Sequence, residues 1–256
     1  MRFACWNMAG GHTFNQSLED GISYEKENLS YFIGELKKVN ADIIVLQESH
    51  TPIDGREKSQ AELIATELGY NLAGNHIYQN PSHIKTGNGL SLAILSKYPT
   101  SGSVFHEVPN PHLTIVRPNG DTWKTYDVGF LTCTVDYQKT TINIVDGHMV
   151  PFHYFKRDFM EDDFSPIRKS ITDLFLSLGE KSTIIGCDFN YNDVPKLLPQ
   201  VFENALYREA FVGIETTPGR GQQDHVLFSH AWKLIKSEVR KASADHFICI
   251  ADIELM

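Results

Sequence analysis

The stretch Ser182-Thr183-Ile184-Ile185-Gly186-Cys187-Asp188-Phe189-Asn190 ends an apolar run with an acid and an amide. Several consecutive positions of the run are apolar, which is typical of a strand covered on both faces. In extended chain, residues two apart point to the same side, so Asp188 and Asn190 are expected to project together. The carboxylate can then accept a proton from a water while the amide donates to a phosphoryl oxygen. An Asx turn that only ends the strand is the alternative.

The same arrangement, a polar residue at the end of a buried strand, recurs along the whole chain. Strand ends converge at a sheet edge, where residues far apart in sequence can share one metal and one phosphate. The sequence therefore predicts a single site, to which six further positions contribute: Asn7, Glu48, His148, Asp224, Asp245 and His246.

Composition and charge bound the kind of protein. The chain has 256 residues with 41% hydrophobic and 21% charged residues, an ordinary globular composition, and it contains no linker or repeat. We expect one domain over 1–256, and we expect a monomer. The formal net charge of −9 repels a polyanion over long range, which lowers the expectation of duplex DNA as substrate.

The N-terminus and the cysteines indicate the compartment. No signal-peptide pattern precedes the first strand, and no run approaches the ~20 apolar residues of a membrane span. A cytoplasmic protein is therefore expected, with a nuclear one equally consistent. The sequence lacks the CxxC and CxxH spacings that are typical of zinc sites. We therefore expect buried, reduced thiols at all four cysteines, which are Cys5, Cys133, Cys187 and Cys249.

Short apolar runs alternate with helical patterns, which favours an α/β protein; taken alone, the pattern suggests a parallel, doubly wound sheet. Helices are expected at 24–39, 58–68 and 165–179, the last capped by Ser165 and ended by Gly179. Three polar stretches beside site strands are expected to carry substrate contacts: 75–88, 150–164 and 216–223. Nine strands are expected, at 2–6, 42–47, 90–96, 128–135, 140–147, 182–187, 225–229, 232–239 and 246–254.

The acids and amides suit a hard divalent cation such as Mg2+ or Mn2+, which needs few protein oxygens. Glu48 is the first choice of ligand, since an unpaired carboxylate after a buried strand is costly. The Asn7 amide oxygen could complete the coordination or hold Glu48, and Asp245 is free to bind a metal or a leaving oxygen.

Two histidines are expected beside the phosphate. If Asp224 accepts a hydrogen bond from the His246 ring, it fixes the tautomer and favours an imidazolium near the scissile bond. His148, after its own strand, would add a further donor. An isolated histidine is more often structural, so the other nine histidines carry no assignment.

Taken together, these motifs resemble the endonuclease/exonuclease/phosphatase superfamily. The resemblance extends from Trp6-Asn7 to Asp245-His246, in the family's order, and includes the central segment 89–99, GLSLAILSKYP. It implies a four-layer α/β sandwich of two mostly antiparallel sheets, packed face to face with helices outside. It also implies that Glu48 binds the metal with Asn7 nearby.

The resemblance implies roles for the remaining site residues. Asp188 would orient or deprotonate the attacking water, and Asn190 would contact phosphate and nucleophile. His246, paired with Asp224, would stabilise the transition state. His148 would lie on the phosphate and Asp245 near a metal.

The chain departs from the family in two places. Ala9 stands where some members have an aspartate two residues after the first-strand asparagine. The acidic run at 161–163 would repel a DNA backbone, although Lys156 and Arg157 could hold a smaller phosphate. Other candidate substrate contacts are Lys85, His153 and Arg220.

The expected function is a metal-dependent phosphoesterase that uses in-line attack by water. The leading subclass is a phosphodiesterase or nuclease acting on nucleic acid or a nucleotide. The enzymatic alternative is a phosphatase or phospholipase-C-type hydrolase of an inositol phosphate, a sugar phosphate or sphingomyelin. A catalytically silent scaffold that binds nucleic acid or a protein is the non-enzymatic alternative.

Overall fold

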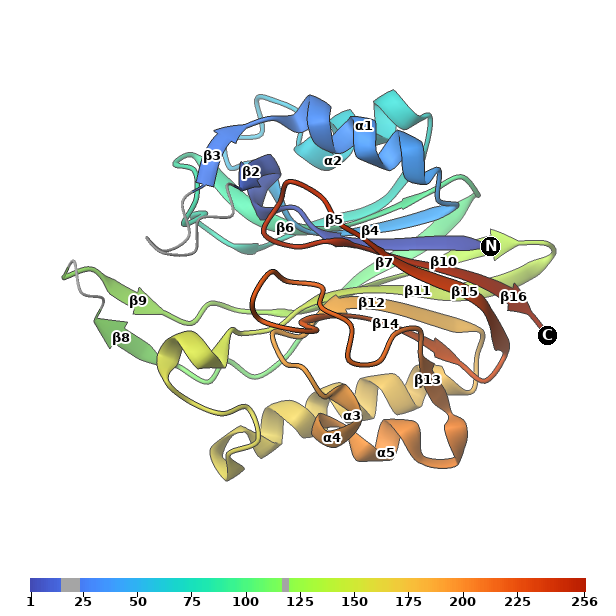
Figure 1. The fold of residues 1–256 in the computed structure, drawn as a ribbon. Helices are drawn as coiled ribbons and strands as arrows, with labels where there is room; N and C mark the ends of the chain where they lie inside the picture. Colours follow the sequence, from blue (N-terminus) through green and yellow to red (C-terminus); the bar gives the residue numbers. More distant parts are fainter. Residues whose placement is uncertain (15–23, 117–119) are drawn as a thin grey trace.

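Two six-stranded sheets pack face to face with helices on both outer sides, as Figure 1 shows for this computed structural model. The structure describes residues 1–14, 24–116 and 120–256. The layers run helix, sheet, sheet, helix. This arrangement confirms the four-layer α/β sandwich that the resemblance implies.

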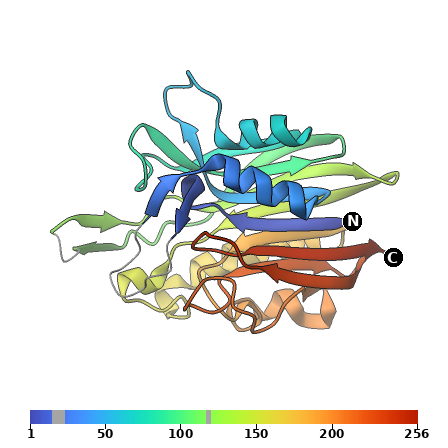
Figure 2. The same ribbon diagram turned by 45° about the horizontal axis from the view of Figure 1, so that its top comes forward.

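The first sheet has the strand order β15-β16-β1-β4-β6-β5. Figure 2 shows the N-terminal strand beside the C-terminal strands, which follows from the pairing of β1 with β16. The strands of this sheet are β1 (Arg2–Asn7), β4 (Ile43–Pro52), β5 (Asn71–Gln79), β6 (Asn88–Ser96), β15 (Trp232–Arg240) and β16 (Ile248–Leu255).

The second sheet has the order β13-β14-β12-β11-β10-β7. Its central strand β12 carries the stretch that ends in Asp188. The strands of this sheet are β7 (Thr100–Glu107), β10 (Gly129–Tyr137), β11 (Thr140–His148), β12 (Thr183–Asp188), β13 (Tyr207–Glu209) and β14 (Asp224–Ser229).

Each sheet contains one parallel pair, β1 with β4 and β11 with β12, and every other pairing described within the two sheets is antiparallel. The parallel, doubly wound sheet suggested by the pattern alone is therefore wrong. Consecutive apolar positions indicate that both faces of a strand are covered. They do not indicate whether a helix or a second sheet covers each face.

The helices form the outer layers. α1 (Leu29–Val39) and α2 (Gln60–Leu68) cover the first sheet, while α3 (Ser165–Gly179), α4 (Val194–Leu197) and α5 (Pro199–Phe202) cover the second (Figure 1). Short 3-10 turns occur at Ala9–Gly11, Phe152–Phe155, Asp162–Phe164 and Glu203–Ala205.

One predicted helix start and one predicted N-cap are wrong, whereas the helix predicted at 165–179 has the bounds of α3. The helix expected from residue 24 begins at Leu29, because Asn28 caps it by accepting the Tyr31 N–H, and Tyr24–Glu27 forms strand β3. Ser165 does not cap α3, whose N-cap is Phe164 at the end of a 3-10 turn. Gly179 lies inside α3, and a Cβ there would meet the Leu206 side chain at 2.7 Å, so close packing requires this glycine.

All nine predicted strands are present, and several others were missed. β5 crosses into the stretch expected to be a polar loop, because its polar residues sit on a partly buried edge strand. β7 also lies at a sheet edge. Two small hairpins, β2 (His12–Phe14) with β3 and β8 (Thr114–Val116) with β9 (Thr122–Lys124), lie outside the main sheets.

The two sheets approach closely at Gly186 in β12. A Cβ at this position would meet Val45 Cγ2 at 2.5 Å and Cys5 Cβ at 3.0 Å, both in the opposite sheet. The four cysteines are buried and unpaired, as predicted. Glycine at 186 therefore sets how near the strand ends of the two sheets can come.

A buried carboxylate also joins the sheets. Asp146 in β11 is fully buried and accepts hydrogen bonds from Gln47 Nε2 in β4 and, at 2.9 Å, from the Ala93 N–H in β6. Burial raises the pKa of Asp146 well above its usual value, although these donors oppose the shift. Asp146 fixes β11 against the opposite sheet near the strand ends.

We predict that Asp146→Ala lowers the free energy of unfolding by about 2 to 4 kcal/mol, since it leaves the Gln47 amide and the Ala93 N–H buried without an acceptor. Asp146→Asn keeps an acceptor and should cost less than half as much. Urea unfolding followed by circular dichroism measures both, with exposed Asp173→Ala as control. Equal stability of Asp146→Ala and wild type would contradict the bridging role.

Candidate active site

Three neighbouring strands of the second sheet bring polar residues into line. His148, the last residue of β11, is in register with Asp188, the last of β12, and Asp188 is in register with Asp224, the first of β14. All three side chains are buried. The sheet therefore presents an imidazole and two carboxylates side by side at one edge.

The first sheet contributes from its own central strands at the same end of the sandwich. Asn7 ends β1 opposite Gln47 of β4, so Glu48 follows one residue beyond the pair. Asp245 and His246 lie shortly before β16 begins, and the Trp6 indole donates a hydrogen bond of 3.0 Å to the His246 carbonyl. The site is thus formed between two sheets rather than along the edge of one.

Glu48 sits at an irregularity in β4. The register with β6 shifts between Leu46 and Ser49, and Glu48 has a positive φ of 54°. A bulge of this kind redirects a side chain, and a strained backbone of this kind is common at functional sites. The bulge directs the Glu48 carboxylate to within 3.4 Å of His148 Nε2.

Asp188 and Asn190 come together through a turn, and not through extended chain as predicted. Asn190 has a φ of 51°, and its backbone N–H donates to Asp188 Oδ1 at 2.9 Å, which is an Asx turn. The Asn190 side chain also donates to the Met149 carbonyl at 3.0 Å. The Asx turn leaves Asp188 Oδ2 directed at the site.

Asp188 Oδ2 is surrounded by nitrogen atoms from both sheets. Asn7 Nδ2 donates to it at 3.0 Å, His148 Nε2 lies at 3.5 Å and His246 Nε2 at 3.7 Å. Burial would raise the pKa of Asp188, but His246, His148 and the Asn7 amide outweigh it and hold that pKa below its usual value. Asp188 is therefore ionised, and its Oδ2 faces two imidazole nitrogens.

Asn7 is placed differently from the expectation. Its amide nitrogen donates to Asp188, and its amide oxygen accepts the Ala9 N–H at 3.0 Å, so both atoms are engaged away from Glu48. Ala9, at a position where some relatives carry an aspartate, is buried and serves this turn with its backbone. Asn7 orients Asp188.

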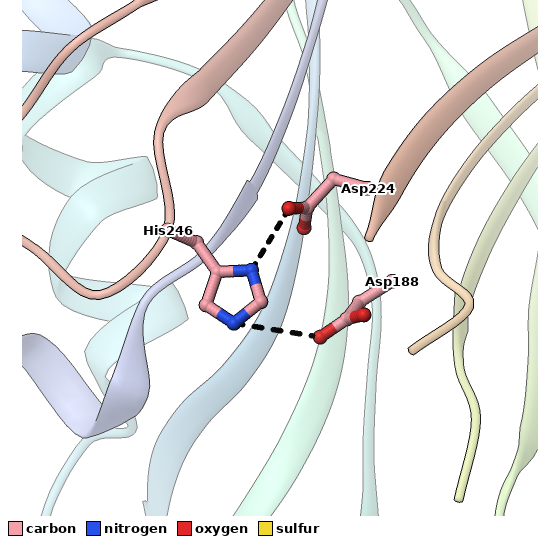
Figure 3. Close-up of side chains that lie close together, drawn as sticks. All are labelled: Asp188, Asp224 and His246. Atoms are coloured by element: carbon pink, nitrogen blue, oxygen red, sulfur yellow. Dashed lines mark hydrogen bonds and ion pairs between the residues drawn. The ribbon is translucent and has the colours of Figure 1, made fainter. Parts of the chain in front are cut away.

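His246 is held between two carboxylates, as Figure 3 shows. Its Nδ1 lies 2.8 Å from Asp224 Oδ2 and its Nε2 faces Asp188. Burial lowers the pKa of His246, but Asp224 and Asp188 raise it well above its usual value. Thr217 Oγ1 lies 3.2 Å from the same Nδ1 and fixes the ring further. The imidazole is kept cationic with Nε2–H directed at the site.

His148 has a similar environment. Its ring is buried, and its pKa is raised because Asp188 and Glu48 outweigh the effect of burial. Its Nδ1 has no hydrogen-bond partner among the described residues, while its Nε2 lies 3.3 Å from Asn190 Nδ2. His148 therefore presents Nε2 at the point where Asn190 and Asp188 meet.

Two carboxylates are short of donors. Asp245 Oδ1 is buried without a hydrogen-bond partner in the described part of the chain, and the pKa of Asp245 is raised to about 6 by burial and by Glu48, Asp188 and Asp224, against His246. Glu48 is mostly buried, and among the described residues it forms an ion pair with His148. Under-satisfied buried oxygens of this kind fit a divalent cation.

A second group of atoms has metal-like spacing. One ligand atom from each of Asp188, Asp224 and His246 lies within 4.8 Å of the others. His246 Nδ1 is already hydrogen-bonded to Asp224, however, so that nitrogen is engaged. The three residues therefore fit a hydrogen-bonded chain better than a set of metal ligands.

Sequence reasoning missed two tyrosines beside the site. Tyr78 of β5 is buried, its ring lies 5.2 Å from that of His148, and its hydroxyl has no partner within the described residues. Burial, with Glu48 as the next cause, raises the pKa of both Tyr78 and Tyr126 well above 10, so both stay protonated. A clearer assignment of β5 would have pointed to Tyr78.

The three candidate loop contacts differ in their surroundings. Lys85 Nζ forms an ion pair with Glu27 at 2.6 Å, so it is already engaged. His153 and Arg220 line a cavity beside Asn190.

Of the described helices, none has the length and apolar character needed to cross a membrane.

Comparison with known proteins gives structural similarity at low identity. An endonuclease/exonuclease/phosphatase from Beutenbergia cavernae matches with a TM-score of 0.72 and 16% identity, over 100% of this chain and 71% of that one. The human nocturnin catalytic domain matches with a TM-score of 0.66 and 16% identity, over 100% of this chain and 93% of that one. A Bacteroides thetaiotaomicron mannosyl-6-phosphatase matches with a TM-score of 0.61 and 14% identity, over 100% of both chains.

Sequence comparison adds the family. No curated protein sequence matches the chain. The model of the Endonuclease/Exonuclease/phosphatase family matches residues 4–246, which include every polar residue described above. The chain belongs to the Endonuclease/Exonuclease/phosphatase family.

Proposed function

We propose that this chain hydrolyses phosphate esters with a divalent metal ion, Mg2+ or Mn2+, by in-line attack of water. The observation that carries the proposal is the environment of Asp188 Oδ2, an ionised oxygen faced by the Asn7 amide and two cationic imidazoles. A buried base with cationic donors on one side matches a reaction in which water loses a proton and a phosphoryl group gains charge.

Glu48 and Asp245 are the residues we assign to the metal. Both carboxylates are largely buried, Asp245 Oδ1 has no hydrogen-bond partner among the described residues, and Glu48 raises the pKa of Asp245, as two acids near one cation would. When bound, the metal would neutralise charge that develops on the phosphate oxygens. Asn7 takes a positioning role, because its amide holds Asp188.

The protein residues then divide the reaction as follows. Asp188 accepts a proton from the attacking water as its oxygen bonds to phosphorus, and Asn190 donates to a phosphoryl oxygen. The P–O ester bond opposite the water breaks, the leaving oxygen takes a proton from solvent, and the His246 imidazolium stabilises the negative charge that develops on the phosphoryl oxygens. Asp224 keeps His246 cationic and oriented, and His148 donates to the phosphate.

The nature of the ester has two candidates. A phosphodiester in nucleic acid or a nucleotide is the expectation from the sequence. A phosphomonoester of a small molecule is favoured by the cavity of about 850 Å3 beside Asn190, and one structural neighbour is a mannosyl-6-phosphatase. The net charge of −9 also opposes a long polyanion. The ordered site counts against a silent scaffold.

The proposal is tested by a hydrolysis panel with and without Mg2+ or Mn2+. The panel contains bis-p-nitrophenyl phosphate, single-stranded and duplex DNA, RNA, a dinucleotide, an inositol phosphate, a sugar phosphate and sphingomyelin. We expect metal-dependent turnover of at least one member, with duplex DNA a poor substrate. No turnover of any member with either ion would revive the scaffold alternative.

We predict that Asp188→Asn and His246→Ala each lower kcat by about 10²- to 10⁴-fold on the best substrate of the panel, because each removes a group that acts in the transition state. Steady-state kinetics measures the loss. The exposed Asp173→Asn and His230→Ala are the matched controls. Folding is checked by circular dichroism, and wild-type kcat in a folded variant would remove that residue from the mechanism.

We predict that Glu48→Gln raises the metal concentration for half-maximal activity by about tenfold or more, because it takes one charged ligand from a site with few ligands. A titration of activity against Mg2+ and Mn2+ measures this. Exposed Glu67→Gln serves as the control. An unchanged titration curve would move the metal away from Glu48.

A further inference from the structure

A cavity of about 850 Å3 opens beside the catalytic centre. It is lined by the segments around Phe152–Glu161, Asn190–Lys196 and Arg220–Gln223, and Asn190 belongs to both the cavity and the site. Pockets of this size suit a small ligand. A substrate whose phosphate lies at Asn190 would therefore extend into this space.

The cavity gathers positive charge in an acidic protein. Four cations line it: Lys156, Arg157, Lys196 and Arg220. Arg157 is engaged with Glu161 and Asp163. The other three form no ion pair with any described residue, so a ligand need not displace a carboxylate to reach them.

The acids of the lining are committed to the backbone. Asp158 Oδ1 accepts the Met160 N–H at 2.9 Å, and Asp193 Oδ1 accepts the Lys196 N–H at 3.0 Å. Glu161 is held by the Asp158 N–H, at 2.7 Å, and by Arg157. These carboxylates fix the loops, while the cations stay available to a ligand.

Arg220 is held near the catalytic pair. Its backbone N–H donates to the Thr217 carbonyl at 3.0 Å, and Thr217 Oγ1 contacts both His246 Nδ1 and Asp224 Oδ2. The Arg220 guanidinium lies 5.0 Å from the centre of the Tyr154 ring. A planar guanidinium fixed over a ring, without a carboxylate partner, is suited to a phosphate or carboxylate.

We propose that this cavity is a second anion subsite, in which Arg220, with Lys156 and Lys196, binds a further phosphate or other anionic group of the substrate. The inference rests on the proposed function, because it starts from a scissile phosphate at Asn190. The preferred substrate is then a small molecule with two anionic groups, and the Tyr191 ring borders the space for its body.

Binding tests the subsite without turnover. Isothermal titration calorimetry in EDTA and 150 mM salt compares matched pairs: AMP with adenosine 3′,5′-bisphosphate, and glucose 6-phosphate with glucose 1,6-bisphosphate. We expect at least one bisphosphate to bind tenfold or more tightly than its monophosphate. Arg220→Gln should reduce that gap to within threefold, and Lys196→Gln should reduce it in part.

The control is Arg56→Gln, an exposed arginine outside the cavity, which should keep the full gap and so exclude a general charge effect. Two results would overturn the subsite while leaving the hydrolase proposal intact. One is equal affinity for the bisphosphate and the monophosphate of every pair, and the other is an undiminished difference in affinity in folded Arg220→Gln. An Arg220-dependent gap in a protein that hydrolyses nothing would overturn the hydrolase alone. A single-stranded DNA pentamer that binds more tightly than every bisphosphate would overturn the small-molecule substrate.

Discussion

The close packing of the two sheets is the constraint on which the site depends. Gly186 lets β12 approach Cys5 and Val45 more closely than any side chain would permit, and Asp146 ties β11 to β4 and β6. The bond from Asn7 to Asp188 crosses between the same two sheets. A shift of one sheet against the other would therefore separate the amide from the carboxylate it orients.

The electrostatics of the site follow from that packing. Burial alone would neutralise Asp188, yet His246 and His148 approach it from different sheets and keep it ionised. The same carboxylate, with Asp224, keeps His246 cationic in spite of burial. Base and cation thus stabilise one another, and each needs the other sheet in place.

The sequence predicted nine of the strands and a gathering of polar residues near their ends, because buried strands and the polar residues that follow them are local patterns. It could not predict the pairing partners: consecutive apolar residues in Ile43–Leu46 fit a helix-covered sheet as well as a sheet-covered one. It also misjudged β5, whose polar edge residues hid Tyr78. The positive φ of Glu48 and the Asx turn at Asp188 depend on neighbouring strands and carry no local signal.

In the proposed function, the loop from Thr216 to Gln223 would link catalysis and substrate choice in one short segment. Thr216 Oγ1 accepts the N–H groups of Gln223 and Asp224, and Thr217 contacts the His246 ring, so the base of the loop is fixed by the catalytic pair. Its tip carries Arg220 into the cavity. The Arg220 hydrogen bonds that fix the tip use its backbone N–H and carbonyl, so the side chain at this position can change without disturbing the Asp224–His246 bond. A scaffold built in this way separates the chemistry, held between the sheets, from recognition, held on the loops.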